Sequence, residues 1–254
     1  GYGSTFFHIL PWMEQANLYK STLGGGGGWA GGPGTYSCWS DPYSIYATVK
    51  SYQCPSDPTN SPKGASGAGN WGSTGYCYNY EVFAVRDGGW SHGKLMTIQA
   101  NPRSNCSDWN AGQWSGQAIP LVMPAGFTDG TSNTILFAER YSQPNPDNPW
   151  AVDWGGNTWW EWAPKFAADF TGPRSKFLTT PPKRFCTDPA NDVWACHLGG
   201  LRNVCSVAAV SPHTGGMNVA LGDGSVRFLN ANMNSVTWWN ACVPNDGGLS
   251  GNDW

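Results

Sequence analysis

Two residues near the C-terminus have the types and the spacing that proton transfer or metal binding requires. Nine residues separate His213 from the dipeptide Asp223-Gly224. An imidazole and a carboxylate in contact could exchange a proton or bind a metal ion. The alternative, which we favour, is a structural hydrogen bond that fixes the turn, with Asp223 serving the Asp-Gly corner. No serine or cysteine nucleophile is tied to this pair by a motif, so a hydrolase triad is not indicated.

Several carboxylates in turn-like segments could act as oxygen ligands. Calcium takes several such ligands, often from loops, although the sequence has no EF-hand spacing. The same side chains could instead bond to their own backbone in Asx turns. We therefore expect either a calcium site or ordinary turn chemistry at these positions. The candidates are Asp129, Asp223, Asp246 and Asp253.

Tryptophans are concentrated in one short stretch, and three roles are open for them. They could form an aromatic core, which we favour, or a subunit interface, or a platform that stacks on sugar rings. Glu161 and Asp153 could be imagined as a glycosidase pair. We do not expect one, because the chain has only four Glu. The candidate interface or glycan residues are Trp150, Trp154, Trp159, Trp160 and Trp162.

The cysteines are even in number and widely spaced. No Cys-x-x-Cys occurs, which argues against zinc ribbons and thioredoxin-type redox sites. Their loop-like surroundings favour disulfides formed in an oxidising compartment, and we expect three or more bridges among the eight cysteines. The alternative is buried thiols that act as small hydrophobes. The disulfide candidates are Cys38, Cys54, Cys77, Cys106, Cys186, Cys196, Cys205 and Cys242.

The composition limits the classes of protein to which the chain can belong. Its 254 residues include 34 Gly, 19 Pro and 16 Trp, whereas aliphatic residues are scarce. Only 12% of the residues are charged and the formal net charge is -3, so we expect no nucleic-acid partner. No stretch is long and apolar enough for a transmembrane helix. We expect an aromatic-cored, extracellular or cell-surface protein with no membrane span in this chain.

The first part of the chain contains one good helix pattern and several weaker strand patterns. The helix should cover residues 11–23, with Pro11 in its first turn and a stop at Gly24. The glycine run 24–28 lacks the Lys-Ser/Thr that follows a phosphate-binding loop. Strands are predicted over 43–54, 76–85 and 94–99, and polar loops over 55–75 and 100–118.

Asp-Gly between apolar runs predicts two tight turns, because glycine tolerates a positive φ. The first turn, at 129–130, leads into the apolar run 134–139. The second, at 223–224, lies in an alternating pattern over 217–228 and predicts a hairpin. A short last helix should begin at a capping Ser235 and run through Cys242.

Several segments together resemble a large bacterial pilin-like family that is abundant in planctomycetes. The family has a C-terminal signature of a His, nine residues and then Asp-Gly, as at His213 and Asp223. The segments follow the family's order through the whole chain, and their combination is specific. The others are 7–15, Cys54-Pro55-Ser56-Asp57-Pro58, 129–140 and Thr237-Trp238-Trp239.

The resemblance implies an exported, envelope-associated, β-rich α+β protein with a pilin-like antiparallel sheet and disulfide-stapled loops. Residues 1–254 would form a single domain, with a Pro-, Trp- and Cys-rich insertion at about 142–205 as the contact surface. The family's long apolar N-terminal helix would precede Gly1 and is not in this chain. We expect a non-enzymatic homo-oligomer, or an open filament if the contact does not close. The alternative is a cell-surface module that binds a polysaccharide or another solute.

Overall fold

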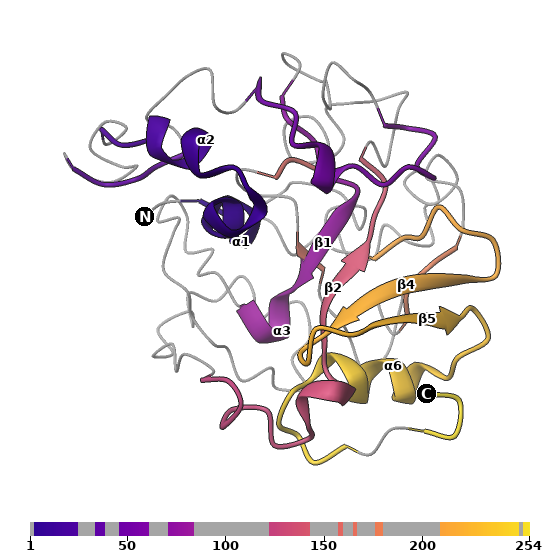
Figure 1. Cartoon of the computed structure of the whole chain (residues 1–254). Helices are drawn as coiled ribbons and strands as arrows, with labels where there is room; N and C mark the ends of the chain where they lie inside the picture. Colours follow the sequence, from indigo (N-terminus) through magenta and orange to yellow (C-terminus); the bar gives the residue numbers. More distant parts are fainter. Residues whose placement is uncertain are drawn as a thin grey trace, which may run out of the picture.

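One five-stranded sheet, in the order β3-β1-β2-β4-β5, organises the computed structural model (Figure 1). Neighbouring strands are antiparallel, except that β1 and β3 run parallel, so the fold is α+β. The strands are β1 (Tyr76–Asn79), β2 (Ile135–Glu139), β3 (Lys165–Phe166), β4 (Gly216–Leu221) and β5 (Val226–Asn230). The structure describes residues 3–24, 34–38, 46–60, 71–83, 122–142, 157–159, 165–166, 176–179, 209–248 and 251–254.

The β4–β5 hairpin confirms the hairpin predicted over 217–228. The two strands pair without interruption from Gly216 opposite Asn230 to Ala220 opposite Val226. At the corner Gly224 has a φ of 85°, a conformation that costs glycine little because it has no Cβ. The apolar run after the other Asp-Gly turn is likewise confirmed as a strand, β2.

Helix α6 (Ser235–Cys242) confirms the predicted last helix, with its cap one residue earlier than expected. The Asn234 side chain accepts a hydrogen bond from Val236 N at 2.8 Å and thereby satisfies a backbone donor of the first turn. Among the described residues no helix combines the length and the apolar character that crossing a membrane requires.

The first of two hydrophobic clusters lies between α6 and one face of the sheet (Figure 1). Alternate residues of β4 point into it, because successive side chains of a strand face opposite sides. Asn79 lies at the edge of this cluster. Its buried side-chain amide donates to Ile135 O and to Cys242 O, each at 2.7 Å. This amide ties β1 to β2 and to the end of α6. The β4 residues and their α6 partners are Met217, Val219, Leu221, Trp238 and Trp239.

The N-terminal segment is a broken series of short helices, so the continuous helix predicted over 11–23 is wrong. The elements are α1 (Thr5–Ile9), η1 (Leu10–Met13) and α2 (Ala16–Ser21). Glu14 has a left-handed φ of 59°, which interrupts the helix because right-handed geometry cannot continue through it. Pro11 does lie in the first turn of η1, and α2 does end before Gly24.

The second cluster lies under these N-terminal helices, on the opposite face of the sheet. The ring of Phe6 in α1 lies 5.6 Å from that of Phe137 in β2 and 6.1 Å from that of Tyr78 in β1, between centroids. Tyr52 donates its hydroxyl to Phe6 O at 2.7 Å. The sheet is therefore covered by α6 on one face and by α1 over β1 and β2 on the other.

One predicted strand is absent from the described residues, and another is shorter than predicted. The part of 43–54 that is described contains the turn η3 (Lys50–Tyr52) and no strand, because its apolar side chains enter the second cluster without backbone pairing. The strand predicted over 76–85 ends at Asn79, whose side chain accepts from Glu81 N and starts α3 (Tyr80–Phe83). The predicted strand 94–99 and loop 100–118 lie outside the described residues.

Candidate functional site

Glu139, the last residue of β2, is the centre of a buried polar network. Its side chain is 3% exposed. Oε1 accepts hydrogen bonds from His213 Nε2 and Asn218 Nδ2, both at 2.9 Å. Oε2 accepts from Ser211 Oγ at 2.9 Å and from Asn218 N at 3.0 Å. A buried carboxylate needs such partners, and these join β2 to β4 and to the segment before β4.

The sheet itself brings these partners together. Ala138 in β2 pairs with Val219 in β4, which places Asn218 beside the end of β2. Val210 N donates to Glu139 O at 3.2 Å and carries the segment with Ser211 and His213 along the same edge. The position of the imidazole therefore follows from strand pairing.

Cys54 reaches the same place from a third segment, through a close approach at Gly75. A Cβ at position 75 would lie 2.7 Å from the Cys54 Cβ, so only glycine fits there. Gly75 O accepts from Arg140 N at 2.9 Å, directly after β2. The buried carboxylate of Asp57 accepts from Ser142 N at 2.7 Å and holds the rest of the cysteine loop against the same stretch.

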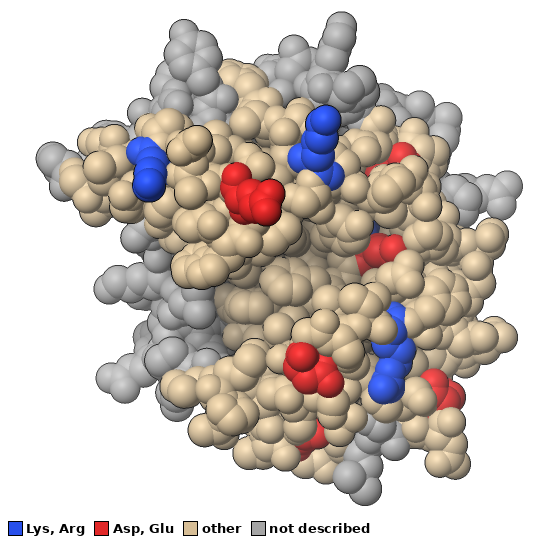
Figure 2. Space-filling model, viewed as in Figure 1, with Lys and Arg blue, Asp and Glu red and all other residues tan. Residues whose placement is uncertain are grey.

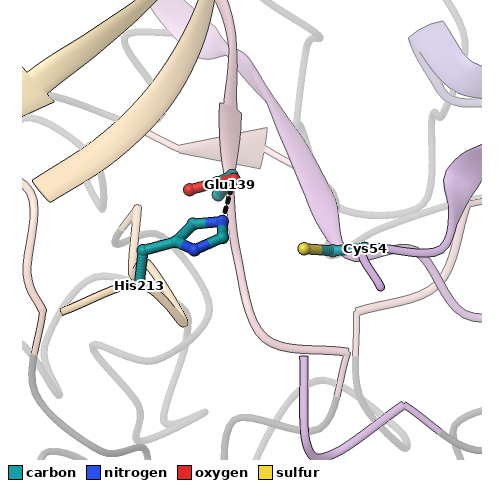
Figure 3. A group of neighbouring side chains, drawn as sticks. All are labelled: Cys54, Glu139 and His213. Carbon is teal, nitrogen blue, oxygen red and sulfur yellow. Dashed lines mark hydrogen bonds and ion pairs between the residues drawn. The ribbon is translucent and has the colours of Figure 1, made fainter. Parts of the chain in front are cut away.

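Cys54, Glu139 and His213 thus face one another from three segments (Figure 3). One ligand atom from each residue lies within 4.8 Å of the other two. Cys54 is 2% exposed, whereas the His213 side chain is 30% exposed, so solvent reaches the group from the imidazole side. In the part of the chain that the structure describes, no other group of three or more His, Cys, Asp or Glu meets in this way.

Burial dominates the electrostatics around Cys54. Burial raises the pKa of the Cys54 thiol, and the nearby carboxylates of Glu139 and Asp57 raise it further. Hydrogen bonds from the backbone N–H groups of Ser56 and Asp57 oppose this shift. Burial, with Cys54 and Glu139 nearby, also raises the pKa of Tyr76 to about 12. The thiol is therefore protonated at neutral pH unless a cation is present.

The predicted contact between His213 and Asp223 is wrong. His213 bonds to Glu139, while Asp223 accepts from Ser225 N at 2.9 Å and from Ser225 Oγ at 2.6 Å. The two residues flank opposite ends of β4, and a strand of that length spans roughly 20 Å. The part of the structural alternative that concerns Asp223 is confirmed, because Asp223 and Gly224 form the hairpin corner, whereas the hydrogen bond of His213 joins Glu139 and not this turn.

The candidate calcium ligands accept hydrogen bonds from backbone and side-chain donors, both near them and far from them in the sequence. Asp129 accepts from Asp246 N at 3.0 Å, so these two lie in one corner. Asp246 accepts from Gly248 N and from Trp239 Nε1. Asp253 accepts from the backbone N of residue 234 at 2.6 Å. The contact of Asp246 with Gly248 N is the Asx-type chemistry weighed above, whereas Asp129 and Asp253 accept from segments farther away along the chain. A calcium ion at these positions stays a prediction.

Of the clustered tryptophans, the structure describes Trp159 alone, and it is a core residue. Its side chain is fully buried, and its Nε1 donates to Ala47 O at 2.8 Å. An interface or glycan role for Trp159 is therefore wrong, and the core role is confirmed for this residue. Trp150, Trp154, Trp160 and Trp162, with most of the insertion 142–205, lie outside the described residues.

The disulfide expectation needs correction. Cys38, Cys54, Cys77 and Cys242 are buried and present as thiols. Since these are four of eight cysteines, the remaining four could form at most two bridges, below the three expected. Cys38, Cys77 and Cys242 lie in the two hydrophobic clusters as small core residues, which is the alternative given above. Cys106, Cys186, Cys196 and Cys205 lie outside the described residues.

Sequence reasoning did not select Glu139, although it lies at the centre of the site. A usable signal was present: glutamate is rare in this chain, and Glu139 ends an apolar run predicted to be a buried strand. A charged residue in such a position requires partners, and His213 and Ser211 were the polar residues next to the neighbouring strand.

Three segments that carried the family resemblance meet at this group, each contributing one residue: Cys54, Glu139 and His213. Neither a curated protein nor a solved structure matches the chain. The family comparison does match, over residues 2–235, to the family SBP_bac_10, described as a protein of unknown function (DUF1559). The chain belongs to this family.

Proposed function

We propose that the protein is a non-enzymatic, exported structural protein whose copies associate with one another at or outside the cell surface. The observation that carries this proposal is the exposed apolar edge strand β5. Val226 is 72% exposed and Phe228 is 53% exposed. Large exposed apolar side chains side by side usually mark a contact surface.

The position of β5 in the sheet favours association through that strand. It pairs with β4 along one edge, and no other described strand pairs with it on the other. Free backbone donors and acceptors at such an edge can pair with a strand of another copy. The charge of Arg227 does not lie beside Val226 and Phe228, because the Arg227 side chain points to the opposite face of the sheet. There its guanidinium carbon lies 4.5 Å from the centroid of the Trp254 ring.

The N-terminal helices leave this part of the sheet uncovered. Val226 and Phe228 lie on the same face as Phe137, where α1 covers β1 and β2 only. Figure 2 shows that the surface is hollowed between the N-terminal helices and the β4–β5 hairpin, with acidic and basic side chains on the rim of the hollow. The formal net charge of the chain is only -3, so electrostatic repulsion between two copies is weak.

The finer parts of the proposal rest on the resemblance rather than on the geometry. They are pilin-like descent with a pilin-like sheet, the C-terminal signature, export, and growth into a filament. The polar network around Glu139 supports a structural role for the signature histidine, because the imidazole fixes β4 next to β2. A rigid β4 in turn holds β5 in position.

Light scattering across a range of protein concentrations tests the proposal, with electron microscopy for filaments. Val226→Lys should reduce association, because it places a charge on the apolar edge. Val236→Lys is the matched control: the same change at a 48% exposed valine on α6 should leave association unaltered.

The alternative is a cell-surface module that binds a carbohydrate or another solute in the hollow beside β4 and β5. It requires a protein that stays monomeric at high concentration and binds a polysaccharide in a glycan screen. That result, or equal association by Val226→Lys and the native protein, would contradict the structural proposal.

A further inference from the structure

We propose that Cys54, Glu139 and His213 form a zinc-binding site. A thiolate, an imidazole and a carboxylate are the three side-chain types that zinc prefers. Three protein ligands leave the fourth tetrahedral position to water, which can enter where the His213 side chain is 30% exposed. The ligands come from three distant segments, so the ion would join the cysteine loop to the sheet.

The observed geometry needs only a small adjustment to accept the ion. Zinc–ligand bonds of about 2.0–2.3 Å at tetrahedral angles place neighbouring ligand atoms about 3.3–3.6 Å apart. His213 Nε2 and Glu139 Oε1 are now 2.9 Å apart, and the three ligand atoms lie within 4.8 Å of one another. The imidazole and the carboxylate must separate by a few tenths of an ångström. The Cys54 sulfur must move about one ångström toward them.

The hydrogen bonds around Glu139 remain largely intact when zinc binds. Only the bond between His213 and Oε1 is replaced, by coordination of both atoms to the same ion. Oε2 keeps Ser211 Oγ and Asn218 N, and these donors orient the carboxylate in the way that outer partners orient metal ligands.

The charges around the sulfur also suit a cation. Backbone N–H groups of Ser56 and Asp57 face the sulfur and favour its thiolate form. Two carboxylates, Glu139 and Asp57, lie close enough to disfavour that thiolate in the absence of a counter-charge. A divalent ion supplies this charge.

The experiment titrates the full chain, stripped with a chelator and kept reduced, with Zn²⁺ in a calorimeter. We expect one equivalent to bind. Cys54→Ser and His213→Gln should each weaken that binding more than about tenfold. Cys242→Ser is the matched control, because it makes the same change at another buried thiol outside the group and should bind as the native protein does.

Co²⁺ gives a readout on the native protein that does not depend on whether the variants fold. Tetrahedral coordination with a thiolate should produce a sulfur-to-cobalt charge-transfer band together with intense d–d absorption. Absence of the charge-transfer band, or equal zinc affinity of Cys54→Ser and the native protein, would overturn the proposal. Loss of both features in Cys54→Ser alone, with Cys242→Ser unchanged, supports it.

Discussion

At the residue scale, Glu139 gives the sharpest prediction, because both of its carboxylate oxygens accept hydrogen bonds from N–H donors and an amide nitrogen could not. Asn218 donates to both of its oxygens, through N at Oε2 and through Nδ2 at Oε1. Whichever way the amide of Glu139→Gln is turned, one of these donors faces an NH₂ group. Since burial prevents water from compensating, we expect a loss of about 1–3 kcal/mol in the free energy of unfolding, measured by urea denaturation.

The hairpin signature residues provide a comparison for that measurement. His213→Ala removes one hydrogen bond and should cost about 1 kcal/mol. Asp223→Asn keeps the acceptor oxygen at the exposed turn and should change stability little. Equal effects of the two substitutions would contradict the assignment of His213 to Glu139.

His8 should make stability depend on pH in a defined window. Burial lowers the pKa of this imidazole from 6.5 to about 4, whereas a hydrogen bond to the Gly3 backbone opposes the shift. Between these values the unfolded chain binds a proton that the folded chain does not. Stability is therefore fully present above pH 6.5 and is lost as the pH falls toward 4, by up to about 1.4 kcal/mol per pH unit.

The neutral variant His8→Gln isolates this effect from the other titrating groups. Urea denaturation at several pH values from 4 to 7 should show a shallower pH dependence for the variant than for the native protein. Parallel curves would mean that His8 titrates alike in both states.

At the scale of elements, Gly75 controls how closely the cysteine loop approaches the sheet. The methyl group of Gly75→Ala would lie 2.7 Å from both Cβ and N of Cys54. Because backbone must then move, we expect a loss of about 1–3 kcal/mol in the free energy of unfolding. Gly224→Ala is a useful contrast in a melting experiment, because nothing lies within 4 Å of its Cβ and only the positive φ of 85° opposes it.

Helices and strands were predicted correctly where the contacts that determine them lie close together in the sequence. The β4–β5 hairpin was predictable because its turn and its alternation lie in one short segment. The broken helix at Glu14 was not, because Phe6 and Phe7 must reach a cluster formed by residues far along the chain, and the backbone turns to allow it. The same holds at Tyr52, whose partner is the carbonyl of Phe6.

At the scale of the whole molecule, buried thiols replace disulfides in the described core. Burial raises the pKa of Cys77 to about 12 and places that of Cys242 well above its usual value. Since the thiolate is the reactive form, both should resist a thiol reagent at neutral pH in the folded protein. They should react once the chain is unfolded, as mass spectrometry of the labelled peptides can show.

Two outcomes would contradict that prediction. One is rapid labelling of Cys77 or Cys242 before unfolding. The other is a disulfide at either residue in protein isolated without reductant, which would restore the original expectation of a bridged framework.

Features that depend on neighbours along the chain were predictable from the order of the amino acids. Asp-Gly corners, the alternation over 217–228 and the helix 235–242 follow from local backbone preferences, and the family follows from the order of its segments. Which side chains meet depends instead on how distant segments pack. His213 forms its hydrogen bond with Glu139 and not with Asp223, because the pairing of β2 with β4 places the end of β2 beside the start of β4. Cys54 joins them because Gly75 lets a third segment approach, a contact that no local pattern encodes.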